Sequence, residues 1–201
     1  MNPAVLALQE ALWDLGISPG ARDGRWGPAT RSALRRAAAF ERMAASTDSP
    51  APDADRGMPR PVPAAVERYG IEDLLDAART VYGEARGESD EGKRAVAYVI
   101  ANRAQSYPPD RGKSLAEICR RRAQFSCWNE GDPNRARVQG MRLDDMHLCA
   151  CLIAVVEALS AADDPTRGAT HYHTRSIAPS WAQGKVPCYT CGGHLFYNNV
   201  A

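Results

Sequence analysis

Apolar residues recur at helical spacing in the C-terminal two thirds of this chain of 201 residues. A helix is predicted over 71–85, where apolar side chains repeatedly fall on one face. A second helix is predicted to begin after Ser89, a preferred N-cap residue, and a third to run from about 144 to 159. Short alternating runs at 170–174 and 194–198 predict a small β-hairpin or flap. The pattern therefore predicts a mainly helical α+β domain.

Two other stretches lack this periodicity. Residues 108–140 are predicted to be mostly irregular, with an aromatic island at 124–128. Residues 46–64 contain five prolines among small and acidic residues, a composition that cannot sustain a helix or bury much surface. We therefore predict a linker here, which separates an N-terminal unit of residues 1–45 from a larger unit of residues 65–201.

The N-terminal unit has the pattern of a small all-α domain. A first helix with regularly spaced apolar residues is predicted to end at Gly16, and a second opens at Pro28, which suits a first helical turn. The segment 36–45 either supplies a third helix or extends the second. At about 45 residues, the unit is close to the lower limit for independent folding.

Composition narrows the classes of function. Lys and Arg total 25 against 24 for Asp and Glu, so the basic excess of a nucleic-acid-binding protein is absent. No apolar segment approaches the length that spans a bilayer, and the first residues lack the features of a signal peptide. We therefore expect synthesis in the cytoplasm, no membrane insertion, and action outside the cytoplasm only after release by another system.

Glu84 is the most informative carboxylate. It lies on the last turns of the helix predicted over 71–85, close to Gly87, and falls beside the apolar face, half sheltered from water. A sheltered carboxyl group keeps its proton more readily, which is the state that a general acid needs near neutral pH. On spacing alone, a salt-bridged surface helix with Glu84 and Glu88 in water is the simpler interpretation.

A turn motif in the N-terminal unit resembles the small three-helix peptidoglycan-binding domain. The resemblance rests on Leu8-Gln9-x-x-Leu12-x-x-Leu15-Gly16 and on Asp23-Gly24-Arg25-Trp26-Gly27-Pro28-Ala29-Thr30. It implies a wall-binding module in which Asp23, Trp26 and Thr30 belong to the characteristic turn. A small helical domain that only adds stability is the alternative.

The C-terminal unit resembles the SleB/CwlJ-type cell wall hydrolases, known from spore-cortex-lytic enzymes and from phage and bacterial lysins. The matching motifs, over roughly 71–198, are Val81-Tyr82-Gly83-Glu84-Ala85-Arg86-Gly87-Glu88, Ala95-Val96-Ala97-x-Val99-Ile100-x-Asn102-Arg103, Gln124-Phe125-Ser126-x-Trp128, Ala169-Thr170-His171-Tyr172-His173, Pro179-Ser180-Trp181-Ala182 and Gly193-His194-x-Phe196-Tyr197. The resemblance implies a lysozyme-like α+β catalytic domain that cleaves peptidoglycan glycan strands, with Glu84 as the catalytic acid.

These motifs also contain candidates for substrate binding. Amide, hydroxyl and imidazole groups can hydrogen-bond the N-acetyl and hydroxyl groups of sugars. Phe125 or Trp128 can stack on sugar faces, or both can belong to the core. The polar candidates are Asn102, Gln124, Ser126, Tyr172 and His173.

A zinc site is an alternative within the same motifs. The candidate ligands are His171, His173, Cys188, Cys191 and His194. The family pattern usually lacks cysteines in this segment, so a Cys188–Cys191 disulfide and two free thiols are also open. The resemblance itself implies no cofactor. Cys119, Cys149 and Cys151 lie in apolar helical patterns and are predicted to be buried free thiols.

Glycan cleavage by Glu84 alone is chemically coherent. Glu84 can protonate the oxygen that leaves N-acetylmuramic acid C1, and then accept the proton of that sugar's C6 hydroxyl as it attacks C1. The product of this lytic transglycosylase route is a 1,6-anhydro sugar. The rival is muramidase-type hydrolysis of the same MurNAc–GlcNAc β-1,4 bond, with Glu88 or Asp90 activating water.

Two further classes stay open. One is a zinc-dependent N-acetylmuramoyl-L-alanine amidase, and the other is a non-catalytic wall-binding or structural component of a phage particle. The favoured interpretation is a monomeric phage or prophage endolysin whose partner is bacterial peptidoglycan. A wall-binding module on a linker raises the local concentration of the catalytic unit on an insoluble polymer.

Overall fold

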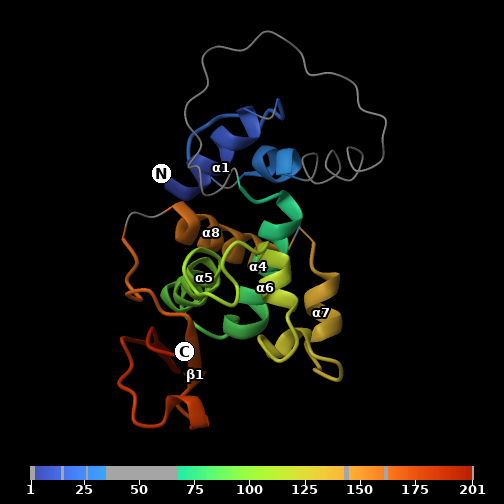
Figure 1. Ribbon diagram of the computed structural model, residues 1–201. Coiled ribbons are helices and arrows are strands. Elements are labelled where there is room, and N and C mark those ends of the chain that lie inside the picture. Colours follow the sequence, from blue (N-terminus) through green and yellow to red (C-terminus); the bar gives the residue numbers. More distant parts are fainter. Residues whose placement is uncertain are drawn as a thin grey trace. The chain divides into compact units, whose positions relative to one another are not determined.

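The computed structural model describes residues 3–14, 16–25, 27–34, 68–142, 145–160 and 163–200 (Figure 1). They fall into two compact units, the first ending at Glu72 and the second beginning at Asp73. The linker predicted over 46–64 and the third helix considered over 36–45 lie outside the described residues, so both stay predictions.

The first unit is organised by one buried amide. α1 (Pro3–Asp14) contributes Gln9, which is 1% exposed. Gln9 Nε2 donates to Thr30 Oγ1 at 2.9 Å, and Gln9 Oε1 accepts from the Gly24 N–H at 2.8 Å. A second helix covers 28–34. Because a buried amide needs hydrogen-bond partners, Gln9 holds the turn and the start of the second helix to α1.

Three long helices form the body of the second unit. α4 (Ile71–Ala85) and α5 (Asp90–Gln105) follow each other closely, and α8 (Met146–Ser160) packs extensively on α5 (Figure 1). Ser89 is the N-cap of α5, as predicted, and its side chain accepts from the Gly92 N–H at 3.2 Å. Residues along most of α5 are buried, because neighbouring elements cover it on several sides.

The segment predicted to be mostly irregular contains more helix than expected. It includes α6 (Leu115–Arg120), the 3-10 turn η1 (Ser126–Trp128) and α7 (Arg135–Gly140). α6 opens with a capping box, in which the side chains of Ser114 and Glu117 each bind the other's backbone N–H. This Ser-x-x-Glu spacing was the local signal for the helix. The pattern missed these helices because each is too short to show a full apolar period.

The predicted hairpin is part of a three-stranded antiparallel sheet in the described chain, with strand order β1-β3-β2. β1 (His171–Thr174) pairs with β3 (His194–Tyr197), and Tyr172 lies opposite Phe196. β2 (Tyr189–Cys191) joins the other edge of β3. The two runs that the pattern identified are neighbours, and β2 was the strand that it missed.

The sheet presents two different faces, because side chains alternate along each strand. One face carries Tyr172, whose ring contacts those of His194 and Phe196. The other carries His173 and Tyr197, whose rings pack against Trp181 of the 3-10 turn η2 (Ser180–Ala182).

The structure confirms the predicted class, a mainly helical unit with a small antiparallel sheet. Within the described residues, no helix has the length and apolar character needed to cross a membrane.

Candidate active site

Glu84 lies in the last turn of α4, and groups from two distant segments hold its carboxylate. The Cys127 N–H donates to Oε1 at 3.1 Å, with the Ser126 hydroxyl at 3.4 Å from the same oxygen. The Tyr172 hydroxyl donates to Oε2 at 3.0 Å. Glu84 is half-buried. The carboxylate is therefore anchored on both oxygens and is still reached from solvent.

Gly83 lets η1 come this close to α4. A Cβ atom at Gly83 would lie 2.5 Å from the Cβ and 2.7 Å from the Sγ of Cys127, which is closer than carbon and sulfur atoms approach. Val138 Cγ2 closes the same space at 3.2 Å. The glycine before Glu84 thus permits the close approach that brings the Cys127 N–H to the carboxylate.

The electrostatics keep the neighbours of Glu84 protonated. Burial, together with the Glu84 charge, raises the pKa of Tyr172 well above its usual value. Burial and the Glu84 charge likewise raise the pKa of the Cys127 thiol. The Tyr172 hydroxyl is therefore a permanent hydrogen-bond donor to the carboxylate across the ordinary pH range.

For the glycan cleavage that the motif resemblance implies, Tyr172→Phe is expected to lower kcat roughly tenfold, the effect of removing about one hydrogen bond to a charged group. Tyr189→Phe is the matched control, because the Tyr189 hydroxyl also donates to a glutamate, Glu91 Oε1 at 2.6 Å, but not to Glu84. The measurement is the initial rate at which soluble fragments are released from insoluble peptidoglycan. Equal rates for the two variants would contradict a role for the Tyr172 hydroxyl.

Glu88 follows the end of α4 and turns to the sheet. Its Oε2 accepts from the Gly193 N–H at 3.4 Å, and its Oε1 lies 3.5 Å from Nδ1 of the buried His194. Gly192 has φ +54°, and a Cβ there would collide with the Glu88 carboxylate. Glu88 is thus a turn residue packed against the β2–β3 connection.

Asn102 and Gln124, both predicted to bind sugar, are engaged inside the protein. Asn102 Nδ2 donates to Asp164 Oδ2 at 2.8 Å and to the Ala169 carbonyl at 3.0 Å. Gln124 Oε1 accepts from Arg103 Nη2 at 2.6 Å. The Asn102 amide nitrogen and the Gln124 amide oxygen are thus already bound to protein groups. These contacts hold neighbouring segments in place.

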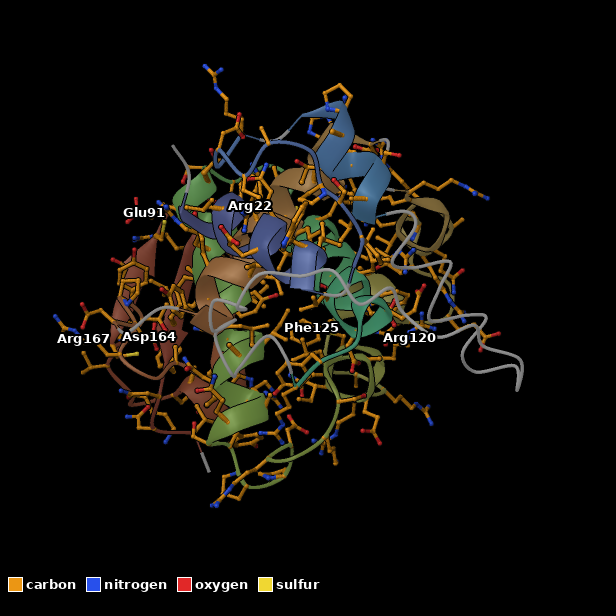
Figure 2. All side chains as sticks on the ribbon, turned by 90° about the horizontal axis from the view of Figure 1, so that it is seen from above. Arg22, Glu91, Arg120, Phe125, Asp164 and Arg167 are labelled. Atoms are coloured by element: carbon orange, nitrogen blue, oxygen red, sulfur yellow. The ribbon has the colours of Figure 1, made fainter. Side chains whose placement is uncertain are left out.

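The two aromatic candidates lie in the core. Phe125 is 2% exposed, and Figure 2 marks its position among the surrounding side chains. Trp128 is 8% exposed and its Nε1 donates to Thr80 Oγ1 at 2.8 Å. Neither ring offers an open face for stacking on a sugar, so the core alternative holds. Among the predicted substrate-binding residues, Ser126 and Tyr172 are the ones that reach Glu84.

The histidines of β1 point away from Glu84. His173 is buried, with Nε2 3.0 Å from the Tyr197 hydroxyl and Nδ1 2.8 Å from the Thr174 carbonyl. Burial, with the Arg103 charge, lowers the pKa of His171 to about 4. The proposed sugar contact through His173 is therefore not supported by its position, because its ring lies on the opposite face of the sheet from Tyr172.

The candidate zinc ligands do not come together. Within the described part of the chain, no three His, Cys, Asp or Glu side chains are grouped to hold a metal ion. The Cys188 thiol donates to the carbonyls of Thr166 and Phe196 at 3.2 and 3.4 Å. Cys188 and Cys191 are free thiols, as are the other four cysteines.

Of the residues predicted for the wall-binding turn, Thr30 faces inward and Asp23 is half-buried. Thr30 is 2% exposed and bonds Gln9. Asp23 Oδ1 accepts from the Arg25 N–H at 2.9 Å and from Gln9 Nε2 at 3.3 Å. Both residues therefore shape the turn, and Trp26 lies outside the described residues. Trp13 is 38% exposed, with the Arg22 guanidinium 4.9 Å from its ring centre.

Comparison with family models supports both resemblances. Residues 87–197 match the model described as cell wall hydrolase, which is more than half of the chain. Residues 1–45 match the model described as a putative peptidoglycan-binding domain. Glu84 lies just before the first match, so its role rests on the site geometry and on the motif that surrounds it.

Individual relatives point the same way. The chain is 31% identical over 131 residues to a spore cortex-lytic enzyme of Halalkalibacterium halodurans, and 30% identical over 133 residues to one of Bacillus subtilis. These matches cover 65% and 64% of this chain but 36% and 38% of the relatives. The catalytic domain of the Bacillus cereus SleB protein superposes with a TM-score of 0.52 at 26% identity, over 64% of this chain and 91% of that domain.

Proposed function

We propose that this chain, which belongs to the cell wall hydrolase family, cleaves the glycan strands of peptidoglycan as a lytic transglycosylase. The observation that carries the proposal is the carboxylate of Glu84, held by donors on both oxygens yet reached by solvent. The spore cortex-lytic enzymes that it resembles support the wall as the substrate.

In the first step, protonated Glu84 gives its proton to the glycosidic oxygen that leaves C1 of N-acetylmuramic acid, and the C1–O bond breaks. Glu84 is then a carboxylate beside a positively charged sugar ring. The Cys127 N–H and the Tyr172 hydroxyl stabilise the negative charge of the Glu84 carboxylate, because hydrogen bonds to an ionised acceptor are stronger than those to a neutral one.

In the second step, the C6 hydroxyl of the same sugar attacks C1 and Glu84 takes its proton. One new C1–O6 bond replaces the broken one, no water is consumed, and Glu84 returns to its protonated form. One carboxyl group thus acts as acid and then as base. The position of Glu88 supports a mechanism with one carboxyl group. Its carboxylate is turned toward the Gly193 N–H and His194 at the β2–β3 turn.

The N-terminal residues 1–45, which match the peptidoglycan-binding model, would keep the catalytic unit on its insoluble substrate. Such tethering replaces a bimolecular encounter by a high effective concentration. We further propose that the protein is a lysin of a phage or prophage, which acts on the wall from within the host after release.

Product analysis tests the proposal. Purified peptidoglycan is digested and the soluble muropeptides are analysed by mass spectrometry. Anhydro-muramic ends, lighter than hydrolysed ends by one water, are expected. Reducing muramic ends would instead identify a muramidase that uses water. Free peptides without sugar cleavage would identify an amidase, and intact peptidoglycan would leave only a binding role.

A further inference from the structure

Arg103 is buried under the site and joins the two segments that hold Glu84. Its side chain is 1% exposed. Nη1 donates to the Thr170 carbonyl at 2.9 Å, two residues before Tyr172. Nη2 donates to Gln124 Oε1 at 2.6 Å, two residues before Ser126. One guanidinium therefore reaches both the start of β1 and the start of η1.

Asp110 and Tyr107 fix the remaining part of the Arg103 guanidinium. Nε donates to Asp110 Oδ2 at 2.6 Å, and Asp110 is fully buried. Arg121 Nη1 holds the other Asp110 oxygen at 2.6 Å, and the Tyr107 ring centre lies 4.5 Å from the Arg103 guanidinium carbon. A planar guanidinium that is held in this way by Asp110 and Tyr107 has one orientation. Its two outer nitrogens therefore set the separation between the segment at Thr170 and the segment at Gln124.

The backbone before η1 depends on such an anchor. Ala123 has φ +63°, a left-handed conformation that is unfavourable for a residue with a side chain. Gln124 follows it directly, and its bond to Arg103 is a contact that holds the chain in this conformation. Strain of this kind persists only where the surroundings impose it.

We propose that Arg103 is a positioning residue for the proposed cleavage: by binding Thr170 and Gln124 at once, it brings the Tyr172 hydroxyl and the Cys127 N–H onto the two oxygens of Glu84. Arg103 itself touches neither Glu84 nor substrate in this arrangement. The inference rests on the proposed role of Glu84.

Gln124→Met tests one arm without disturbing the buried ion pair. Gln124 is half-buried, so the variant is expected to fold with a Tm within a few degrees of the parent. Its kcat is expected to fall roughly 10- to 100-fold, as for other small misplacements of catalytic groups, with KM within about twofold. Gln124→Glu keeps an acceptor oxygen opposite the guanidinium and is expected to restore most of kcat. A rise in KM with unchanged kcat would overturn the proposal in favour of a sugar contact.

Arg103→Lys tests the fork itself. Lysine keeps the positive charge beside Asp110 but lacks the separate nitrogens with which the planar guanidinium reaches Thr170 and Gln124, so kcat is expected to fall as in Gln124→Met. Arg79→Met is the matched control, because Arg79 bonds Asp76 and the Met141 carbonyl and none of the groups that hold Glu84. An equal loss of kcat per folded molecule in the control would overturn the proposal.

A spectroscopic readout reports the geometry without activity. In protein with isotope-labelled cysteine amides, the Cys127 resonance is identified by its response to Glu84→Gln. Gln124→Met is expected to move this resonance toward its position in Glu84→Gln, while Arg79→Met leaves it in place. An unmoved resonance overturns the positioning role. If the parent cleaves nothing, the proposed function fails, and the resonance still decides whether Arg103 positions the turn.

Discussion

Glu84→Gln is expected to lower the rate of peptidoglycan cleavage by roughly a thousandfold, within the range that general acid–base groups contribute. The amide has the shape of the carboxyl group but can neither give a proton to the leaving oxygen nor accept one from the C6 hydroxyl. Both proposed steps pass through this one group, so a substantial loss is expected even if each step is only partly dependent on it.

The fold should survive this change. The amide oxygen that the substitution introduces can still accept from one of the two principal donors, the Cys127 N–H or the Tyr172 hydroxyl. The measurement is release of soluble muropeptides, with sedimentation of the protein with insoluble peptidoglycan as a second readout. Binding is expected to be retained because residues 1–45 are unchanged.

Glu72→Gln serves as the matched control on the same helix. Glu72 is exposed at the start of α4, far along the helix from the last turn. It is expected to keep the parent's rate. A Glu84→Gln variant that cleaves as fast as this control would remove Glu84 from the mechanism.

Gly83→Ala is expected to lower kcat on the order of a hundredfold, since a shift of about 1 Å in a catalytic contact is enough for such a loss. The added methyl group would meet the Cβ and Sγ of Cys127, and η1 must move to admit it. The movement carries the Cys127 N–H away from Glu84 Oε1. Rates are measured per folded molecule, with the folded fraction taken from thermal unfolding.

A second substitution distinguishes this clash from a general effect on α4. Cys127→Gly removes the two closest atoms that the new methyl group would meet and keeps the N–H that donates to Glu84. The double variant Gly83→Ala with Cys127→Gly is therefore expected to recover much of the lost kcat. If the double variant is slower than Gly83→Ala alone, the steric account of Gly83 is wrong.

The local pattern predicted some parts of the site well. It placed Glu84 at the end of a helix and beside the apolar face, and the residue is half-buried at the end of α4. It also identified Ser89 as an N-cap. Both features depend on neighbours within one or two helical turns, which is the range over which periodicity and capping act.

Other parts could not be predicted from residue type alone. Asn102 and Gln124 have side chains that suit sugars, but the structure occupies them with Asp164 and Arg103. Arg103 and Gly83 belong to the recognised motifs, but their residue types alone did not mark either of them as part of the site. Their importance comes from tertiary contacts: Cys127 lies against Gly83, and Thr170 and Gln124 bind Arg103. A sequence motif does not specify such contacts.

Sequence alone therefore identified Glu84 as the candidate catalytic acid, because the motif around it is continuous and its helix is set by local spacing. Tertiary structure decided what surrounds it. Cys127 lies 43 residues and Tyr172 lies 88 residues further along the chain. These groups meet because α4, η1 and β1 pack together, and packing over such separations depends on the whole second unit.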